Sequence, residues 1–217
     1  MCSLRNRRKN RKGGNMTEKE KGKAGLFYNP NYDPELTKER EWVKDRCFEY
    51  NNIPPSHREE RKALMKEMLG GTKGEFLIES PFNCDYGYNT FIGENFYANH
   101  GLVLLDTARV TIGDNVFIAP NCGIYCAGHP IDKDERSEGL EYALPVTIGD
   151  DVWIGGNVAI LPGVTVGSNV VIGAGSVVTK DIPSGVVAAG NPCRVIRPIT
   201  AEDKGRFPSV AQRKTVK

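Results

Sequence analysis

Residues 146–178 read VTIGDDVWIGGNVAILPGVTVGSNVVIGAGSVV. An aliphatic residue recurs at every sixth position of this stretch, namely at Ile148, Ile154, Ile160, Val166, Ile172 and Val178. A second small or aliphatic residue stands two positions before each of them, at Val146, Val152, Val158, Val164, Val170 and Ser176. A period of six fits neither an α-helix nor a long strand, but it is typical of the short strands and turns of a parallel β-helix. Because each coil buries its apolar side only against another coil, this stretch predicts a stacked solenoid with the aliphatic side chains inside.

The same six-residue step occurs in two earlier parts of the chain. One block consists of Ile112, Ile118 and Ile124, and the other of Ile92, Ala98 and Leu104. The step from Leu104 to Ile112 is eight residues, which predicts a turn with two extra residues. Glycine directly follows the aliphatic residue at Gly149, Gly155, Gly167 and Gly173. We expect glycine or asparagine after the aliphatic residue to allow turns with positive φ.

The chain before the repeats has a helical pattern. Asp33 and Pro34 predict a helix start, with Asp33 as the N-cap and Pro34 at the first helical position. The apolar residues that follow have roughly helical spacing: Leu36, Val43, Cys47, Phe48 and Tyr50. The segment NNIPPS at 51–56 should end this helix, and Ser56 with Glu59 predicts a capping box for a second one. The apolar side of that second helix consists of Leu64, Met65, Met68 and Leu69.

These patterns divide the chain into four parts. We expect a basic, disordered leader over residues 1–16 and a helical segment over 17–71. The β-helix should then cover 72–198, with an extended loop at 130–145, and a polar tail should cover 199–217. The expected fold is therefore mainly β: a parallel β-helix of hexapeptide repeats with a small α-helical segment at its N-terminal end.

Composition excludes several classes of protein. No run of 18 apolar residues occurs, and no apolar segment follows the basic start, so we expect neither a membrane span nor a secretory signal. The first twelve residues hold six arginines and lysines, without which the formal net charge of +2 becomes −4. We therefore expect no nucleic-acid partner. The six cysteines form no CxxC motif, which favours free thiols in a reducing, cytoplasmic compartment.

The six-residue repeat is interrupted near one of the three histidines of the chain. It stops after Ile124 and resumes at Val146, and residues 130–145 are charged and bounded by prolines. His129 immediately precedes this loop, so a rigid scaffold should hold it beside a movable segment. A histidine in such a place can act as a general base near neutral pH. Its position alone also fits a surface or structural histidine.

Five segments together resemble one known family. They are NFYANHGLVLLD at 95–106, GHP at 128–130, GLEYALPVTIGDDVWIGGNVAILPGVTVG at 139–167, VIGAGSVVTKDIP at 171–183 and VVAAGNPCRVIR at 186–197. They resemble the maltose and galactoside O-acetyltransferases, which are left-handed parallel β-helix proteins. The resemblance extends to the helical segment from about Thr17. It implies transfer of an acetyl group from acetyl-CoA to a sugar hydroxyl, without a metal, in a homotrimer whose active sites lie between neighbouring coils.

The resemblance also implies roles for individual residues. His129 matches the family's catalytic base, and Asn99 and the N–H of Gly156 match groups near the thioester carbonyl. Glu141 is our candidate for the acceptor that holds the other ring nitrogen of His129. The expected acceptor-binding residues are Asn29, Asp85, Tyr97 and Asp106. The expected CoA-binding residues are Ala174, Thr179, Lys180, Arg194 and Arg197. Asn29 and Thr107 stand where relatives have acidic residues, which leaves the identity of the sugar open.

Other functions remain open at this stage. A serine or an antibiotic could be the acceptor, and a solenoid could also be a binding module without catalytic activity. Cys126, which we expect to point outward, could form an acyl-enzyme with His129. A zinc-dependent carbonic anhydrase on this scaffold needs three histidines on adjacent coils, and only His100 and His129 lie in the repeats, so we expect no metal site.

Overall fold

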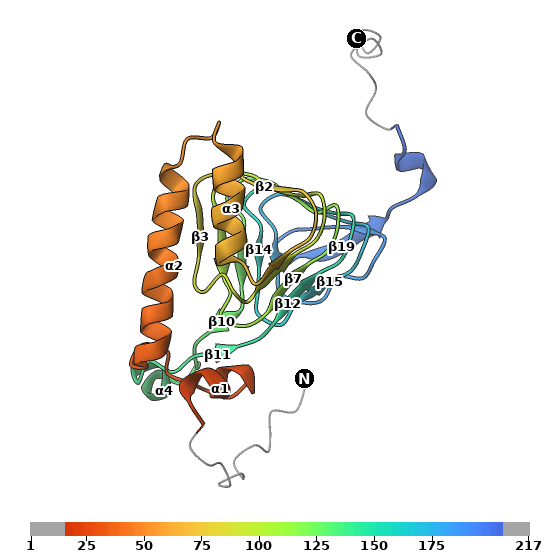
Figure 1. Cartoon of the computed structure of the whole chain (residues 1–217). Helices are drawn as coiled ribbons and strands as arrows, with labels where there is room; N and C mark the ends of the chain where they lie inside the picture. Colours follow the sequence, from red (N-terminus) through yellow and green to blue (C-terminus); the bar gives the residue numbers. More distant parts are fainter. Residues whose placement is uncertain (1–15, 206–217) are drawn as a thin grey trace.

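The computed structural model describes residues 16–205 and confirms the predicted parallel solenoid (Figure 1). Most of its strands form three sheets, and each complete coil contributes one strand to each sheet in turn. The strands pair in parallel within these sheets, except that the last strand of the second sheet is antiparallel to its neighbour. The first sheet contains β1 (Gly71–Thr72), β4 (Thr90–Ile92), β7 (Val110–Ile112), β12 (Val146–Ile148) and β15 (Thr165–Val166). The second contains β2 (Phe76–Ile78), β5 (Phe96–Ala98), β8 (Phe117–Ile118), β13 (Val152–Ile154), β16 (Val170–Ile172), β18 (Val186–Ala189) and β19 (Arg194–Pro198). The third contains β3 (Phe82–Cys84), β6 (Leu102–Leu105), β9 (Gly123–Tyr125), β14 (Ala159–Ile160) and β17 (Val177–Val178).

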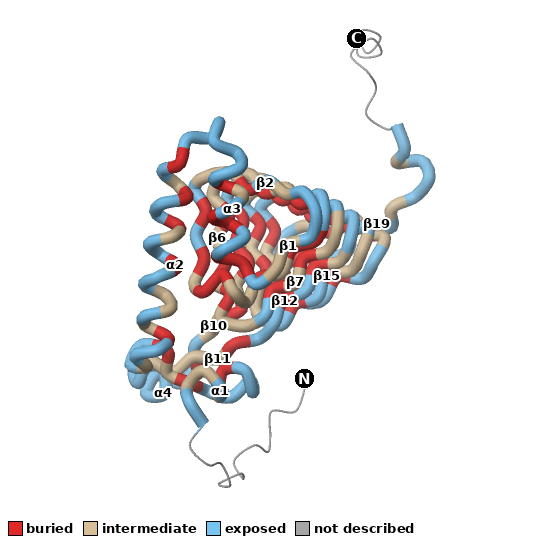
Figure 2. The backbone as a smooth tube through the Cα atoms, viewed as in Figure 1, coloured by how far each residue is buried: buried red, intermediate tan, exposed pale blue. Residues whose placement is uncertain are grey.

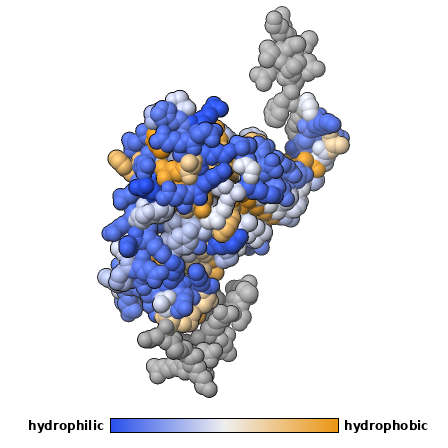
Figure 3. Space-filling view, viewed as in Figure 1, coloured by the Kyte–Doolittle hydropathy of each residue, from blue (hydrophilic) through white to orange (hydrophobic). Residues whose placement is uncertain are grey.

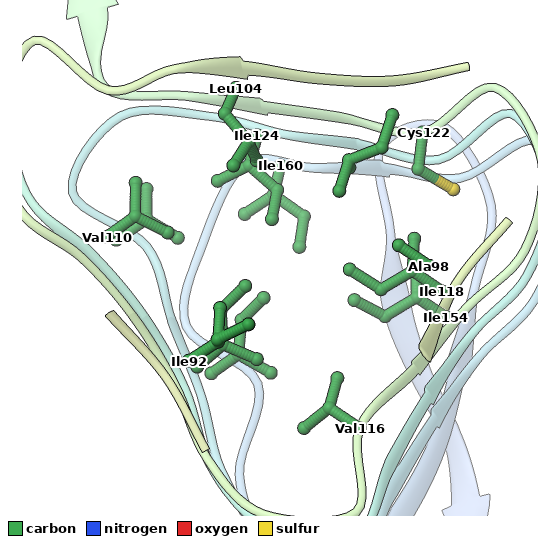
Figure 4. Close-up of a cluster of buried hydrophobic side chains, with 14 of the residues drawn as sticks. Ile92, Ala98, Leu104, Val110, Val116, Ile118, Cys122, Ile124, Ile154 and Ile160 are labelled. Carbon is green, nitrogen blue, oxygen red and sulfur yellow. The ribbon is translucent and has the colours of Figure 1, made fainter. Parts of the chain in front are cut away.

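The inward side chains of successive coils lie in register. In the second sheet Ala98 pairs with Ile118, and Ile118 pairs with Ile154. These three residues are at most 1% exposed. Figure 2 shows buried residues along the inside of the coils, and Figure 4 shows aliphatic side chains from different sides of the coil pointing into one core. The six-residue column predicted from the sequence is therefore the core of the molecule.

The solenoid begins one coil before the first block recognised in the sequence. Thr72, Ile78 and Cys84 pair with Ile92, Ala98 and Leu104 of the next coil. Thr72 and Cys84 are not aliphatic, which hides the six-residue step in this coil. Cys84 nevertheless points inward and is 6% exposed, as expected of a core position.

Glycine serves the turns in a different way from the one predicted. The positive-φ residues lie two positions farther along, for example at Asp151 (φ 57°) and Asn169 (φ 54°). Gly149 itself is needed for close packing, because a Cβ atom there would lie 2.5 Å from Ser168 Oγ of the next coil. The same holds for Gly155, where a Cβ atom would lie 2.6 Å from the backbone nitrogen of Ala174. The coils stack so closely at these turns that no side chain fits between them.

Three consecutive turns from the third sheet back to the first sheet carry extra residues. The inward residues before and after them are eight positions apart at Cys84 and Ile92 and at Leu104 and Ile112, and twenty-four apart at Ile124 and Ile148, instead of six. The three turns cover residues 85–89, 106–109 and 126–145. The third is more ordered than the predicted loop, since it contains helix α4 (Lys133–Ser137) and the antiparallel pair β10 (Ala127–Gly128) and β11 (Tyr142–Ala143). All three long turns follow strands of one sheet, so they project from the same edge of the β-helix.

Three helices precede the coils: α1 (Glu18–Lys23), α2 (Pro34–Asn52) and α3 (Arg58–Met68). The predicted Asp33 cap is confirmed, because its side chain accepts a hydrogen bond from the Leu36 N–H at 2.9 Å. Helix α2 packs against β3 and α3, with the buried residues Leu36, Val43, Cys47 and Tyr50 on one face. Figure 1 shows α1, α4, β10 and β11 gathered near the start of α2.

Two details of the helical prediction are wrong. Helix α3 has no Ser56–Glu59 capping box; its N-cap is His57, which makes no side-chain capping bond. The reason is a turn closed by the His57 N–H and the Pro54 carbonyl at 2.9 Å, which delays the helix by one residue. Phe48 is 73% exposed, because Cys47 and Tyr50 occupy the face of α2 that meets the coils.

The cysteines of the described residues are free and buried, at Cys47, Cys84, Cys122, Cys126 and Cys193. Cys126 is 0% exposed, so the expectation that it points outward is wrong. Strand-like stacking continues past β9, with the Cys126 N–H bonded to the Leu105 carbonyl at 2.9 Å, and this keeps the side chain in the inward phase.

The two ends of the chain are only partly described. The leader predicted over 1–16 lies outside the described residues except for Met16, and so does the tail from residue 206 onward. The first part of the expected tail forms a 3-10 turn at Ala201–Asp203. Between residues 16 and 205, no helix combines the length and the apolar character needed to cross a membrane.

The column of buried aliphatic residues predicts that two substitutions on β12, one pointing inward and one outward, change the stability by different amounts. Ile148 is 1% exposed, and its neighbour Thr147 points outward on β12. We expect Ile148→Ala to lower the free energy of unfolding by about 2–5 kcal/mol, because it leaves a cavity between two stacked coils. Thr147→Ala should change it by less than about 1 kcal/mol. Urea denaturation of both variants at equal protein concentration measures the difference, and equal midpoints would contradict the proposed role of the column.

Candidate functional site

Most of the predicted site residues lie on two different edges of the β-helix; Asn29 lies before α2, Tyr97 on β5, and Arg194 and Arg197 on β19. Turns that follow the second sheet form what we call the Asn99 edge, comprising residues 99–101, 119–122, 155–158 and 173–176. Turns that follow the third sheet form the His129 edge, comprising residues 85–89, 106–109, 126–145, 161–164 and 179–181. The Asn99 edge holds Asn99, Gly156 and Ala174, whereas the His129 edge holds Asp85, Asp106, His129, Glu141, Thr179 and Lys180.

His129 is held by the backbone of its own loop. Its Nδ1 lies 3.0 Å from the Leu140 carbonyl oxygen, which can only accept, so Nδ1 carries the proton. In the neutral ring, Nε2 is then the basic nitrogen. Nε2 lies 4.0 Å from Glu141 Oε1, and the His129 side chain is 51% exposed.

The orienting role predicted for Glu141 therefore needs correction. The antiparallel pairing of β10 with β11 places Leu140 and Glu141 opposite the residues that follow β10. The Leu140 carbonyl reaches Nδ1, while the Glu141 carboxylate lies beside the other ring nitrogen. Glu141 is placed to stabilise positive charge on Nε2 rather than to fix the tautomer.

Glu141 is a buried carboxylate with defined partners. Its side chain is 15% exposed, and its Oε2 accepts a hydrogen bond from the Tyr28 hydroxyl at 3.3 Å. Burial raises the pKa of Glu141, while the nearby His129 and the Tyr28 hydrogen bond act in the opposite direction. The carboxylate is thus stabilised by two groups from different parts of the chain.

Asp85 and Asp106 lie on successive long turns but differ in accessibility. Burial raises the pKa of Asp85, and the charges of Arg40 and Lys44 oppose this shift. Asp106 is 0% exposed and accepts hydrogen bonds from the N–H groups of Tyr86 (2.8 Å) and Asp85 (3.1 Å) and from the Thr90 hydroxyl (3.0 Å). A direct contact between Asp106 and a ligand, as expected from the sequence, is not possible in this arrangement. Asp106 instead holds the turn that carries Asp85.

Asn29 and Thr107 occupy the positions that depart from the family pattern. Asn29 Nδ2 donates to the Glu138 carbonyl at 2.7 Å, and its Oδ1 accepts from the Asn31 N–H at 3.1 Å. The side chain thereby ties the N-terminal segment to the loop at 130–145. The Thr107 hydroxyl is buried near the Tyr28 hydroxyl, where it acts to lower the pKa of the phenol, and it makes no hydrogen bond of ordinary geometry among the described residues.

Arg40 of α2 lies against the His129 edge and was not predicted from the sequence. It donates to the Tyr86 hydroxyl at 2.7 Å and to the Pro30 carbonyl at 2.8 Å. Its charge also acts on Asp85 and Glu141, where it favours the ionised carboxylates. The sequence contains one signal for it, because a charged residue at position 40 interrupts the apolar stripe of α2 between Leu36 and Val43.

The Asn99 edge presents donors and small residues. Asn99 Oδ1 accepts from the His100 N–H at 2.7 Å, whereas its Nδ2 makes no hydrogen bond to the described part of the chain. Gly156 and Ala174 lie on consecutive coils, with the Gly175 N–H bonded to the Gly156 carbonyl at 2.8 Å. Tyr97 lies just before this edge on β5 and lines a groove of about 480 Å³ together with Phe76, Leu77 and Phe117.

The polar and basic candidates for CoA binding differ in how free their side chains are to bind a ligand. Thr179 and Lys180 are exposed on the His129 edge. Arg194 lies on β19 and donates to the Cys193 carbonyl at 2.7 Å. Arg197 forms a two-pronged ion pair with Asp203, with both N···O distances at 2.7 Å.

The alternative chemistries find little support at this site. Burial raises the pKa of the Cys126 thiol to about 12, which keeps it protonated and weakly nucleophilic near neutral pH. Within residues 16–205, no group of three histidine, cysteine or acidic side chains is arranged to hold a metal ion.

Comparison with known proteins identifies relatives over most of the chain. The maltose acetyltransferase hexapeptide capping motif matches residues 21–74, and the bacterial transferase hexapeptide model (six repeats) matches residues 145–180. The galactoside O-acetyltransferase of Escherichia coli (strain K12) is 48% identical, over 88% of this chain and 93% of its own length.

Two solved structures have the same architecture. A maltose O-acetyltransferase from Clostridium difficile 630 superposes with a TM-score of 0.84 and 52% identity, covering 85% of this chain and 98% of that one. A galactoside acetyltransferase in complex with coenzyme A superposes with a TM-score of 0.85 and 48% identity, covering 88% and 94%.

The buried carboxylate of Asp106 predicts a pH-dependent stability. Burial raises its pKa from 3.8 to about 6, so the folded protein binds a proton that the unfolded chain releases between these values. The stability that this proton confers is present below pH 3.8 and is lost as the pH rises through 6. Relative to wild type, Asp106→Asn should therefore gain up to about 3 kcal/mol in free energy of unfolding between pH 4 and pH 7. Denaturation curves at both pH values test this, and a constant difference between the two proteins would refute it.

Proposed function

The chain belongs to the maltose and galactoside O-acetyltransferase family of hexapeptide-repeat proteins, and we propose that it transfers the acetyl group of acetyl-CoA to a sugar hydroxyl. As in that family, it is an acetyl-CoA-dependent acetyltransferase. The observation that carries the proposal is the arrangement of His129, with Nδ1 bonded to a carbonyl and Nε2 accessible beside a carboxylate.

His129 acts as the general base in this proposal. An alcohol is a poor nucleophile at neutral pH, so Nε2 accepts the hydroxyl proton while the oxygen attacks the thioester carbonyl carbon. The Leu140 carbonyl keeps the ring in the tautomer that leaves Nε2 free, and Glu141 at 4.0 Å stabilises the imidazolium that forms. When the carbon–sulfur bond breaks, the imidazolium returns its proton to the departing CoA sulfur, which leaves an acetyl ester and CoA.

The negative charge on the thioester oxygen requires donors aimed at it. Asn99 Nδ2 and the Gly156 N–H are the groups proposed for this role. The free Nδ2 of Asn99 supports the assignment, because its Oδ1 is already bonded to the next residue and fixes the direction of the amide.

We further propose that the site is shared between the subunits of a homotrimer. Asn99 and His129 lie on different edges of the β-helix, so one chain presents only half of the proposed machinery at each edge. An apolar ladder runs up the outer face of the second sheet, where Leu77, Tyr97, Phe117 and Trp153 pair in register. Leu77, Phe117 and Trp153 are 38%, 43% and 54% exposed, and Figure 3 shows hydrophobic patches interrupting a mostly hydrophilic surface. This ladder is the surface proposed to meet the neighbouring subunit.

Acetyl-CoA is proposed to lie along the coils between two subunits. Gly156 and Ala174 provide a row of small residues that an extended ligand can approach closely, and Thr179 and Lys180 provide polar contacts from the other edge. Arg194 and Arg197 are the candidates for the phosphates. Arg197 can take this role if a phosphate shares or replaces its ion pair with Asp203.

The acceptor is proposed to bind at the His129 edge, next to Asp85 and Glu141, with Tyr97 of a neighbouring subunit closing the site. Asn29 is proposed to contribute to acceptor binding by holding the loop at 130–145 through its bond to the Glu138 carbonyl. We propose a cytoplasmic location, because the described cysteines are free thiols and acetyl-CoA is the donor.

The assignment of His129 predicts a clear loss of catalysis. His129→Ala should lower kcat by about 10²–10⁴-fold, because no other group accepts the hydroxyl proton, while CoA binding persists. His57→Ala is the matched control, since His57 is an exposed histidine at the start of α3. Steady-state assays with maltose, glucose and thiogalactosides, together with calorimetry of CoA binding, test both effects. Near-normal turnover of His129→Ala would disprove the base assignment.

The shared site predicts complementation between two inactive variants. His129→Ala and Asn99→Ala should each be inactive alone, whereas co-refolded mixtures should regain about a quarter of wild-type activity. In equal mixtures about three quarters of trimers contain both variants, and each of these has one site with both residues intact. If His129 and Asn99 of the same chain acted together, the mixture would stay inactive, and the shared-site proposal would fall.

A further inference from the structure

We propose that Tyr28 is a positioning residue that holds the Glu141 carboxylate beside Nε2 of His129, so that the N-terminal segment before α2 forms part of the catalytic machinery. The inference rests on the proposed function, in which His129 becomes positively charged during the reaction. Tyr28 lies outside the repeats, 113 residues before Glu141 in the sequence.

The backbones of Tyr28 and Glu141 are bonded in both directions. The Tyr28 N–H donates to the Glu141 carbonyl at 3.1 Å, and the Glu141 N–H donates to the Tyr28 carbonyl at 2.9 Å. The two residues thus form an isolated antiparallel bridge. Such a bridge fixes the Cα position and direction of Glu141 before any side-chain contact is considered.

Two further contacts attach the same segment to the loop. Asn29 Nδ2 donates to the Glu138 carbonyl at 2.7 Å, and the Asn29 N–H donates to Glu18 Oε2 at 2.6 Å. Helix α1 is therefore connected through Asn29 to the part of the loop directly before Glu141. The loop between α4 and β11 is held on this side by residues from the helical segment rather than by the coils.

The Tyr28 side chain contacts one oxygen of the Glu141 carboxylate and leaves the other oxygen facing His129. The phenol donates to Oε2 at 3.3 Å, and Oε1 faces Nε2 of His129 at 4.0 Å. The phenol cannot easily leave this position, because Tyr28 is 3% exposed and packs with Leu36, Tyr86 and Ala143. A carboxylate with one oxygen fixed in this way keeps the other directed at the ring, without having to be ordered during the reaction.

The charged and titratable groups that face Glu141 determine the sign of the expected pH effect. They are His129, Tyr28, Asp85 and Arg40. Burial raises the pKa of Glu141 and Asp85 adds to this, whereas His129, the Tyr28 hydrogen bond and Arg40 lower it. Removing the phenol hydroxyl removes one group that favours the ionised carboxylate. The pKa of Glu141 then rises, and Glu141 becomes neutral at a higher pH than in the wild type.

The test compares Tyr28→Phe with Tyr32→Phe. Tyr32 is 80% exposed and lies on the same segment, so its variant loses a hydroxyl without touching the loop. We expect Tyr28→Phe to lower kcat by about 3–10-fold, in line with the loss of one hydrogen bond to a charged group, with the KM for acetyl-CoA unchanged. The part of the acidic limb of the kcat/KM profile that Glu141→Gln abolishes reports protonation of Glu141, and in Tyr28→Phe it should move to higher pH. Tyr32→Phe should match the wild type in all three measurements.

A Glu141→Gln background separates positioning from a general effect on folding. If Tyr28 acts through the Glu141 charge, Tyr28→Phe should cause neither a further fall in kcat nor a pH shift in that background. Equal losses in both backgrounds, or a Tyr28→Phe profile that coincides with the wild type, would overturn the inference.

A second readout does not depend on turnover. The Glu141 carboxyl can be titrated by NMR in the full chain, and its midpoint should rise in Tyr28→Phe and stay unchanged in Tyr32→Phe. An unchanged midpoint in Tyr28→Phe would overturn the inference. A wild type without acetyl transfer to any sugar, but with the expected shift, would overturn the proposed function and leave the Tyr28–Glu141 link intact.

Discussion

Each aliphatic side chain of the column is removed from water only because the coils above and below carry one in the same register. Ile154 is buried between Ile118 and Ile172, and a shift of the chain by one residue in any coil would turn this column outward. The coils are also tied together at the turns, where Asn115 Nδ2 donates to Asp151 Oδ1 of the next coil and Asn95 Nδ2 donates to Asn115 Oδ1, both at 3.0 Å. Strands therefore cannot gain or lose residues without a large loss of burial. Extra residues are tolerated only at turns, and this confines the functional groups to the edges of the β-helix.

A stack of coils also needs an end that does not expose its core, and the helices provide it. Arg61 of α3 is 4% exposed and donates to the carbonyl oxygens of Tyr50 and Ile78, which belong to α2 and β2. Its guanidinium lies 4.2 Å from the centre of the Tyr50 ring, and the Tyr50 hydroxyl donates to the Ile78 carbonyl. One cation thus satisfies carbonyl groups of the last helix turns and of the first coil together. Helix α2 also carries Arg40, and the segment with Tyr28 directly precedes this helix, so the N-terminal part that closes the core also supplies side chains to the His129 edge.

The parts of the molecule that have a local or periodic sequence pattern could be predicted from the sequence. Contacts between residues that are distant in the sequence could not. The column from Ile92 to Val178, the Asp33 cap and the long turn after Leu104 were all readable, because each has a local pattern. The first coil was not, since Thr72 and Cys84 break the aliphatic pattern while keeping its spacing. The contact of His129 with the Leu140 carbonyl could not be predicted either, because it involves a backbone atom whose position is set by the two-residue antiparallel pairing of β10 with β11. The buried position of Asp106 depends in the same way on backbone donors of a neighbouring turn, which residue types do not reveal.

The long turns explain why one half of the proposed site, on the His129 edge, can vary in structure more than the other half, on the Asn99 edge. On the Asn99 edge the turns are short and stacked, with the Asn157 N–H bonded to the Pro120 carbonyl and the Gly175 N–H bonded to the Gly156 carbonyl of the neighbouring coils, which leaves little room for variation. This suits a cosubstrate whose shape is constant. On the His129 edge the third turn leaves the stack, and its position depends on β10, β11 and the contacts of Tyr28 and Asn29 with Glu141 and Glu138. Substitutions in this turn or in the N-terminal segment change the surroundings of Nε2 without disturbing the core column. In the proposed reaction, selection for a different acceptor would therefore act on the N-terminal segment and the loop, while the residues that hold acetyl-CoA stay fixed by the stacking of the coils.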